Sequence, residues 1–280
     1  ANILEDAQVQ TIIGDEANAT LAQELSAAGI SVLSLAELEA SFGGEQLPLG
    51  SAKASAYLLY TSGSTGEPKA ITQSHCNVLH HIASYTNSLH LSGEDRLLLI
   101  ASLGVDAAVQ DIFGALLNGA TVCPYDVRSN ELGALAQWMA QEEITVFHAT
   151  PSLYRYFVAA LSEPPRRWSF PKLRLVVLGG EKVVPSDLEL YKEHFEPGCL
   201  LVNGYGLSES TVSLQCFFDM AYENAGRSIP IGNPVEETEV LLLNAQGEPG
   251  QVCGEIALAS AYLPQGYWRR PQLTTAGFLA

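Results

Sequence analysis

The sequence predicts an α/β fold: layered sheets of the βαβ type with flanking helices, and a small antiparallel β piece at the carboxyl-terminal end. Short apolar runs such as residues 56–60 and 173–180 indicate buried strands, and they alternate with segments whose apolar residues recur at helical spacing. Toward the end of the chain the pattern changes to short alternating strands between Gly, Pro and Asn turns. We therefore expect an α/β core over residues 1–224, incomplete at its start, and an antiparallel β subdomain over residues 225–280, incomplete at its end.

Each element follows from its local pattern. Ser74 can cap the first turn of a helix through its hydroxyl, and Pro151 suits a first helical position, where no N–H is needed. The segment NAQGEPG, residues 244–250, has the turn residues of a β-hairpin. The apolar runs predict strands over residues 9–13, 30–35, 56–60, 96–102, 120–125, 144–150, 173–180 and 199–206. The helical spacings predict helices over residues 17–28, 74–89, 106–117, 131–142, from 151 onward, and over 185–195.

Composition and charge restrict the partners of the protein. The chain has 280 residues, 47% of them hydrophobic, which is enough for one large domain or two smaller ones. Its 14 Lys and Arg against 31 Asp and Glu give a formal charge of −17, which repels phosphate backbones and anionic lipid. The cysteines form no C-x-x-C pair, and no apolar run reaches the ~18 residues of a membrane helix. We expect a cytoplasmic protein whose main partner is neither nucleic acid nor a membrane.

The strongest local signal directly follows the strand at residues 56–60. It is a loop of hydroxyls and glycines that ends in a lysine: Thr61, Ser62, Gly63, Ser64, Thr65, Gly66, Glu67, Pro68 and Lys69. Glycines let backbone N–H groups approach a polyphosphate, hydroxyls can donate to its oxygens, and the lysine adds a positive charge. It is not a Walker A loop, because Pro68 separates Gly66 from Lys69. The alternative reading of such a loop is a Ser- and Gly-rich surface turn.

The strand and loop together, AYLLYTSGSTGEPKAI, resemble the signature phosphate loop of the adenylate-forming superfamily of AMP-binding enzymes, which includes peptide synthetase adenylation domains, acyl-CoA ligases and luciferases. Three further segments resemble the family in the same order: VDAAVQDIFGALLNGA (105–120), LVNGYGLSEST (201–211) and GEIALASAYLPQGYWRRPQLTTAGF (254–278). Ser208 stands where the family pattern has Thr. The resemblance is closest to the core of a nonribosomal peptide synthetase adenylation domain.

This resemblance implies ATP and Mg²⁺ as cofactors. Asn203 would contact the edge of adenine and Tyr205 would stack on its face, while Glu209 would help to bind Mg²⁺. Taken alone, these three residues would be a turn Asn, a packed Tyr and a first-turn helix carboxylate. The implied catalytic residues are Thr61, Lys69, Ser208 and Glu209. The implied nucleotide-binding residues are Thr61, Ser62, Gly63, Ser64, Thr65, Gly66, Lys69, Gly180, Glu181, Asn203, Tyr205, Gly206 and Ser208.

Asp106 bears on the class of substrate. In the peptide synthetase branch an Asp at this place pairs with the substrate's α-ammonium, which needs such a partner in a mostly apolar pocket. The alternative role for Asp106 is the N-cap of the helix that it begins. The same resemblance implies a substrate pocket made of Asp106, Ala107, Gln110, His148, Val177, Gly179, Gly204, Val212 and Ser213. Since Asp106 is its one charged group, we expect an α-amino acid with a neutral side chain of moderate size.

The family pattern extends beyond both ends of this chain, so we expect a fragment with little or no activity by itself. The implied reaction converts an amino acid and ATP to aminoacyl-AMP and pyrophosphate, with a phosphopantetheinyl carrier domain as the partner of the parent protein. Two alternatives remain open. One is an acyl- or aryl-CoA ligase, which has no need of Asp106. The other is a non-catalytic nucleotide-binding remnant.

Overall fold

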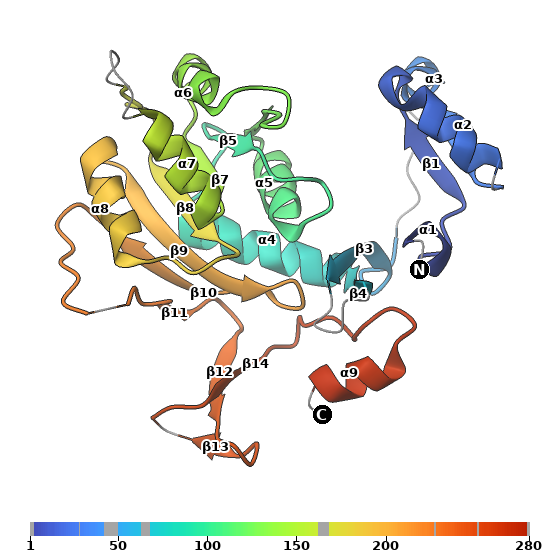
Figure 1. Cartoon of the computed structure of the whole chain (residues 1–280). Helices are drawn as coiled ribbons and strands as arrows, with labels where there is room; N and C mark the ends of the chain where they lie inside the picture. Colours follow the sequence, from blue (N-terminus) through green and yellow to red (C-terminus); the bar gives the residue numbers. More distant parts are fainter. Residues whose placement is uncertain are drawn as a thin grey trace. The chain divides into compact units, whose positions relative to one another are not determined.

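The structure is a computed structural model that describes residues 3–27, 29–41, 50–62, 68–161, 168–226, 228–250 and 252–278. The chain divides into two compact units, which are described separately: residues 1–75 with 266–280, and residues 76–265 (Figure 1). The boundary predicted between residues 224 and 225 lies inside the second unit. The division into an α/β core and a β subdomain stays a prediction.

The first unit contains a two-stranded parallel sheet, an antiparallel hairpin and short helices. The parallel sheet is made of β1 (Thr11–Gly14) and β2 (Ser31–Ser34), joined through α2 (Ala19–Ala27), which confirms the strand–helix–strand prediction for this segment. The other elements of this unit are α1 (Ile3–Asp6), η1 (Glu16–Asn18), α3 (Leu35–Ser41), β3 (Ser55–Ser62), β4 (Pro68–Ser74) and α9 (Pro271–Gly277).

Strand β4 was not predicted from the sequence. It pairs antiparallel with β3, so that Thr61 lies opposite Lys69 and Ser62 lies opposite Pro68. Ala70 and Ile71 are 1% and 0% exposed, which anchors β4 in the unit. The segment predicted to bind phosphate therefore falls between the paired strands β3 and β4, and helix α4 (His75–Leu89) begins only after β4 ends.

The second unit is built on a seven-stranded sheet in the order β11-β10-β9-β8-β7-β5-β6. Strands β5 to β9 run parallel, and β10 and β11 are added antiparallel at one edge. Its strands are β5 (Arg96–Leu99), β6 (Thr121–Pro124), β7 (Val146–Ala149), β8 (Leu175–Gly179), β9 (Leu200–Leu207), β10 (Thr211–Phe218) and β11 (Asn233–Pro234). Its helices are α4, α5 (Asp106–Leu116), α6 (Leu132–Gln141), α7 (Pro151–Leu161) and α8 (Pro185–His194). The predicted α/β class is confirmed.

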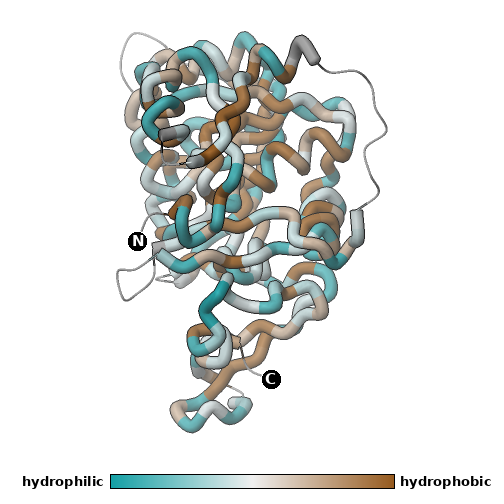
Figure 2. The backbone as a smooth tube through the Cα atoms, turned by 90° about the vertical axis from the view of Figure 1, so that its right-hand side faces the viewer, coloured by the Kyte–Doolittle hydropathy of each residue, from teal (hydrophilic) through white to brown (hydrophobic). Residues whose placement is uncertain are grey.

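Helices cover both faces of this sheet. Successive residues of a strand point to opposite sides, so each strand contributes side chains to both layers. One face packs Leu98, Phe147, Val176 and Leu201 against α6, α7 and α8. The other face packs Leu97, Val146, Leu175, Val177 and Val202 against α4 and α5. Figure 1 shows the helices beside the sheet, and Figure 2 draws the hydrophobic stretches of the backbone in brown.

The antiparallel piece predicted near the end of the chain is a three-stranded sheet in the order β13-β12-β14. Its strands are β12 (Glu239–Leu243), β13 (Pro249–Gly250) and β14 (Glu255–Ala259). The predicted hairpin is confirmed: the Asn244 side chain accepts hydrogen bonds from the backbone N–H groups of Gln246 and Glu248, and Gly247 has φ +77°. In the described part of the chain, no helix combines the length and the apolar character that a membrane span requires.

Candidate functional site

A cavity of about 350 Å³ lies in the second unit, where β5, β7 and β8 end and α5 begins. In open α/β sheets this is the edge at which ligands bind, beyond the carboxyl ends of the parallel strands. Seven of the nine residues predicted for the substrate pocket line it: Asp106, Ala107, Gln110, His148, Gly179, Gly204 and Val212. Gly180 and Gly206, predicted for the nucleotide, line it as well. The structure therefore brings together residues from four separate segments of the sequence.

Asp106 is the first residue of α5 and lies half-buried in the cavity wall. The N-cap position belongs to Val105, whose backbone is extended and which makes no side-chain capping bond. The Asp106 carboxylate accepts from the N–H of Ala107 at 3.0 Å. The alternative role of Asp106 as the N-cap residue is therefore wrong.

His148 lies in β7 and is hydrogen-bonded to Asp111 of α5, with 2.9 Å between Nδ1 and Oδ1. The two side chains are 8% and 1% exposed. Burial disfavours the charged imidazole, but the carboxylates of Asp111 and Asp106 outweigh burial and raise the pKa of His148. Asp111 was missed by the site prediction. The available signal was its helical spacing: it lies three residues after Ala108 and four before Ala115, on the buried face of α5.

Glycines keep the cavity open. A Cβ on Gly179 would lie 3.9 Å from His148 Nε2 and 3.3 Å from the Gly204 carbonyl oxygen, and would therefore project toward the histidine. Gly206 is required for a different reason: a Cβ there would lie 1.7 Å from the carbonyl oxygen of Thr211, on the facing strand. Thr211 itself has φ 55°, and the pairing of β9 with β10 is irregular between Val212 and Leu214. The tight approach of the two strands thus excludes any side chain at Gly206.

Two predicted pocket residues do not line this cavity. Val177 is 1% exposed and packs in the core between the sheet and helices α4 and α5. Ser213 is also 1% exposed, and its hydroxyl donates to the Ser210 hydroxyl at 2.8 Å. Val177 pairs with His148 in the sheet register, so it supports the cavity from the neighbouring strand.

The residues that were predicted to bind adenine lie in different elements of the second unit. Asn203 is 5% exposed and donates through Nδ2 to the Pro230 carbonyl at 2.9 Å. Tyr205 is half-buried in β9. The Glu181 carboxylate accepts from the backbone N–H and the hydroxyl of Ser152, at 3.0 and 2.5 Å, in the first turn of α7. A carboxylate is favourable at that end of a helix, so Glu181 has a structural role there.

Ser208 and Glu209 lie in the turn between β9 and β10 and are half-buried. The alternative role of Glu209 as a first-turn helix carboxylate is wrong, because the chain reverses into β10 and no helix follows. A single carboxylate suits Mg²⁺, which commonly keeps several waters and takes only one or two carboxylates beside phosphate oxygens. Within the described ranges, no group of three or more His, Cys, Asp or Glu could hold a metal by itself.

The phosphate loop belongs to the first unit. Thr61 and the backbone of Ser62 form the end of β3, and Lys69 follows Pro68 in β4. The remaining predicted residues of the loop lie outside the described residues: Gly63, Ser64, Thr65 and Gly66. Lys69 Nζ donates to the hydroxyl of Tyr267 at 2.6 Å and lies 4.2 Å from the centroid of its ring. Tyr267 was not predicted as a site residue, and no local pattern connects two residues so far apart in the sequence.

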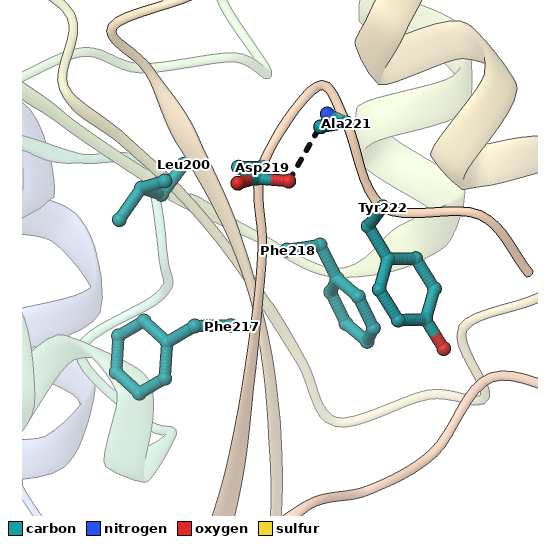
Figure 3. A pocket seen from close by; sticks show the side chains of 6 residues that line it. All are labelled: Leu200, Phe217, Phe218, Asp219, Ala221 and Tyr222. Atoms are coloured by element: carbon teal, nitrogen blue, oxygen red, sulfur yellow. Dashed lines mark hydrogen bonds between the residues drawn. The ribbon is translucent and has the colours of Figure 1, made fainter.

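A second cavity, of about 380 Å³, lies at the opposite end of β9 (Figure 3). It is lined by Leu200, Phe217, Phe218, Asp219, Ala221 and Tyr222, and Asp219 accepts from the N–H of Ala221. It contains none of the predicted site residues and lies at the amino end of the parallel strand. The cavity beside Asp106 is therefore the stronger candidate for the functional site.

Comparison with known proteins identifies a family for this chain. The family model described as "AMP-binding enzyme" matches residues 1–268. The chain is 33% identical to syringomycin synthase SyrB1 of Pseudomonas syringae pv. syringae, over 99% of this chain and 45% of that synthase. It is 30% identical to tyrocidine synthase 3 of Brevibacillus parabrevis, over 99% of this chain and 4% of that synthase. The chain thus spans less than half the length of these relatives.

The solved structures include the nonribosomal peptide synthetase FmoA3 in its α-methyl-L-serine-AMP-bound form. The TM-score is 0.86 and the identity 28%, over 99% of this chain and 31% of that one. The AMPPNP-bound form of the same synthetase gives a TM-score of 0.87 at 27% identity, over 100% of this chain and 30% of that one.

Proposed function

Because the chain belongs to the family of AMP-binding enzymes, we propose that it forms the core of an adenylation domain that activates an α-amino acid in a nonribosomal peptide synthetase. The reaction joins the amino acid's carboxylate to the α-phosphorus of ATP. The bond between the α-phosphorus and the bridging oxygen breaks, and pyrophosphate leaves with its electron pair. The observation that carries the proposal is Asp106, a half-buried carboxylate in the wall of an otherwise mostly apolar cavity.

The cavity suits an amino acid because the negative charge of Asp106 matches the positive charge of the substrate's α-ammonium. The substrate's α-ammonium is costly to bury without an anionic partner, and Asp106 supplies one. Gly179 and Gly204 leave space beside it, and Gln110 and His148 provide polar groups. The solved relative that binds α-methyl-L-serine-AMP supports the same class of ligand. A simple acyl or aryl acid has no group to pair with Asp106.

For the nucleotide, we propose that the loop from Thr61 to Lys69 binds the β- and γ-phosphates of ATP. Lys69 supplies a positive charge and Thr61 a hydroxyl donor, and the two residues pair with each other at the loop end of the hairpin. We propose that Asn203 and Tyr205 hold adenine and that Ser208 donates to the α-phosphate. The solved relative that binds AMPPNP supports the use of ATP. These groups act by positioning the reactants and by stabilising charge on the phosphates.

We propose Glu209 as the protein ligand of Mg²⁺. When bound, Mg²⁺ supplies positive charge that stabilises the leaving pyrophosphate. One carboxylate is sufficient for an ion that takes its remaining ligands from phosphate oxygens and water. Glu209 and Ser208 share the β9–β10 turn. In this proposal the turn therefore provides both a hydrogen-bond donor for the α-phosphate and a metal ligand.

The test is exchange of labelled pyrophosphate into ATP by the complete protein that carries this chain, with a panel of amino acids, fatty acids and aryl acids. Exchange that depends on one amino acid supports the proposal. Exchange with a fatty or aryl acid instead would identify an acyl- or aryl-CoA ligase, and nucleotide binding without exchange would identify a non-catalytic remnant. Transfer of the activated amino acid to a phosphopantetheinyl carrier domain, followed by mass spectrometry of that domain, tests the proposed partner.

A further inference from the structure

Thr211 has a strained backbone next to the turn that carries two of the proposed site residues. Its φ of 55° lies in the left-handed region, which a β-branched residue rarely adopts and where Gly or Asn is usual. Thr211 begins β10 and lines the cavity beside Asp106. Ser208 and Glu209 lie between it and the end of β9. Such strain persists only where neighbouring groups hold the residue in place, and it is common at functional sites.

The hydroxyl of Thr211 is held from two sides. It donates to the backbone carbonyl of Ser210, with 2.6 Å between Oγ1 and the carbonyl oxygen. His81 of α4 lies 130 positions earlier in the sequence, and its Nδ1 is 2.8 Å from the same Oγ1. The hydroxyl has a single proton, which it gives to the Ser210 carbonyl, so it accepts from the Nδ1–H of His81. Helix α4 therefore holds the strained residue through a specific hydrogen bond.

His81 occupies a position that an apolar residue would fill at a lower cost. It is 8% exposed and belongs to the buried face of α4, together with Ile82, Tyr85 and Leu89. Its other ring nitrogen, Nε2, is buried without a hydrogen-bond partner among the described residues. A buried polar atom without a partner destabilises the folded state. The imidazole therefore needs a role that offsets this cost, and its contact with Thr211 supplies one.

The turn beside Thr211 is closed by its own hydrogen bonds. The N–H of Ser210 donates to the carbonyl of Leu207 at 2.9 Å, and the N–H of Leu207 donates to the Ser210 hydroxyl at 3.3 Å. These two bonds join the ends of the turn to each other. The hydrogen bond from His81 adds a link from this region to α4, which restricts where the residues of the turn can lie relative to the sheet.

We propose that His81 is a positioning residue for adenylation: its hydrogen bond to Thr211 fixes the turn that presents Ser208 and Glu209 to the phosphates and the Mg²⁺ of ATP. The inference rests on the proposed function, because it assumes that this turn contacts the nucleotide and the metal. His81 itself touches neither and acts through Thr211.

Pyrophosphate exchange by the complete protein tests the contact with two substitutions. In His81→Asn the amide nitrogen can take the place of Nδ1 and keep the hydrogen bond, whereas in His81→Gln it reaches toward the place of Nε2. We expect His81→Gln to lower kcat/KM for Mg²⁺·ATP at least tenfold, because misplacing a contact group by about 1 Å can cost on the order of 100-fold. His81→Asn should stay within about threefold of wild type. Equal losses in the two variants, or no loss in His81→Gln, overturn the inference.

Thr211 provides the other end of the contact, which covers the case in which His81→Gln does not fold. Thr211→Val keeps the shape of the side chain and removes the hydroxyl, so it should cause at least as large a fall in kcat/KM. Thr211→Gly adopts the left-handed backbone without strain, so adding His81→Gln to it should lower kcat/KM by less than about twofold. A tenfold effect of His81→Gln in that background shows that His81 does not act through Thr211 and overturns the inference.

His80→Gln is the matched control, because His80 is the neighbouring histidine of α4 and stacks on Tyr262 with 3.6 Å between ring centroids. It should change kcat/KM by less than about twofold. A binding measurement without turnover completes the test: calorimetry should show that His81→Gln weakens the affinity for Mg²⁺·AMPPNP at least tenfold and that His80→Gln leaves it within twofold. Equal affinities of wild type and His81→Gln overturn the inference and leave adenylation standing. If the wild type exchanges pyrophosphate with no carboxylic acid, the proposed function fails and this inference fails with it.

Discussion

Lys69 and Tyr267 lie 198 positions apart in the sequence, yet the ammonium of Lys69 donates to the phenol oxygen of Tyr267 at 2.6 Å. The contact exists because Tyr267 pairs with Ile71 of β4 and the N–H of Trp268 donates to the Ala70 carbonyl. Tyr267 and Trp268 are thereby fixed beside the β3–β4 hairpin. The hydrogen bond holds the Lys69 ammonium beside the phenol oxygen.

Lys69→Ala should therefore weaken the use of ATP. The lost contact with phosphate is charge-assisted and worth about 1.5–3 kcal/mol, which corresponds to a fall in kcat/KM for ATP of roughly 10- to 100-fold. Tyr267→Phe keeps the ring and removes only the hydroxyl, so it should raise KM for ATP by less than about tenfold and leave kcat nearly unchanged. Both are measured by pyrophosphate exchange over a range of ATP concentrations. If Lys69→Ala behaves like wild type, Lys69 is not a phosphate ligand.

Asp106→Ala should remove the partner of the substrate's ammonium. We expect a loss of about 3–5 kcal/mol with the amino acid, as when one member of a buried ion pair is removed. The loss should be much smaller with the matching des-amino acid, which has no ammonium. Equal losses with both substrates would show that Asp106 acts through the structure of α5 and not through the ammonium.

Asp95→Asn should destabilise the protein in a pH-dependent way. Arg174 donates to both oxygens of Asp95, each at 2.8 Å, and Thr145 and Ser92 donate as well. Burial raises the pKa of Asp95, but these hydrogen bonds outweigh burial and lower it. A carboxylate with a lowered pKa stabilises the folded state above its unfolded pKa of about 3.9, and the contribution is lost as pH falls through its folded pKa.

Urea unfolding at pH 7 should therefore show a loss of about 3 kcal/mol for Asp95→Asn. The difference from wild type should shrink as the pH falls below about 4. Glu142→Gln is the matched control, because Glu142 pairs with Arg96 but is 41% exposed. It should cost less than about 1 kcal/mol. A pH-independent loss for Asp95→Asn would contradict the ionic origin of the effect.

Gly206→Ala should destabilise the second unit by about 3 kcal/mol or more, because its Cβ would overlap the Thr211 carbonyl on the neighbouring strand. Gly133→Ala provides the comparison: no atom lies within 4 Å of a Cβ there, and the residue is in helix α6. That change should be neutral or should stabilise by up to about 1 kcal/mol. Thermal unfolding of both variants measures the difference, and similar midpoints would mean that β9 and β10 separate more easily than their spacing implies.

The local pattern of the sequence was sufficient to predict most helices and strands of the second unit. The strands at β7 and β8 and the helices at α5, α6 and α8 were predicted nearly at their observed bounds, because the period of the apolar residues is a local property. Strands β4 and β10 were missed. Each forms one arm of an antiparallel hairpin, so its assignment depends on a partner strand as much as on its own residues.

The sequence by itself determined the α/β class, the family resemblance and most of the cavity's lining, since its motifs follow the strands whose ends meet there. Tertiary structure alone decided which side chains became partners. His148 and Asp111 are 37 positions apart, and Lys69 and Tyr267 are 198 apart. Helical or strand period shows only which face a residue occupies. The register of the strands and the packing of each helix on its sheet determine what that face contacts, and these arise from long-range contacts that no local pattern contains.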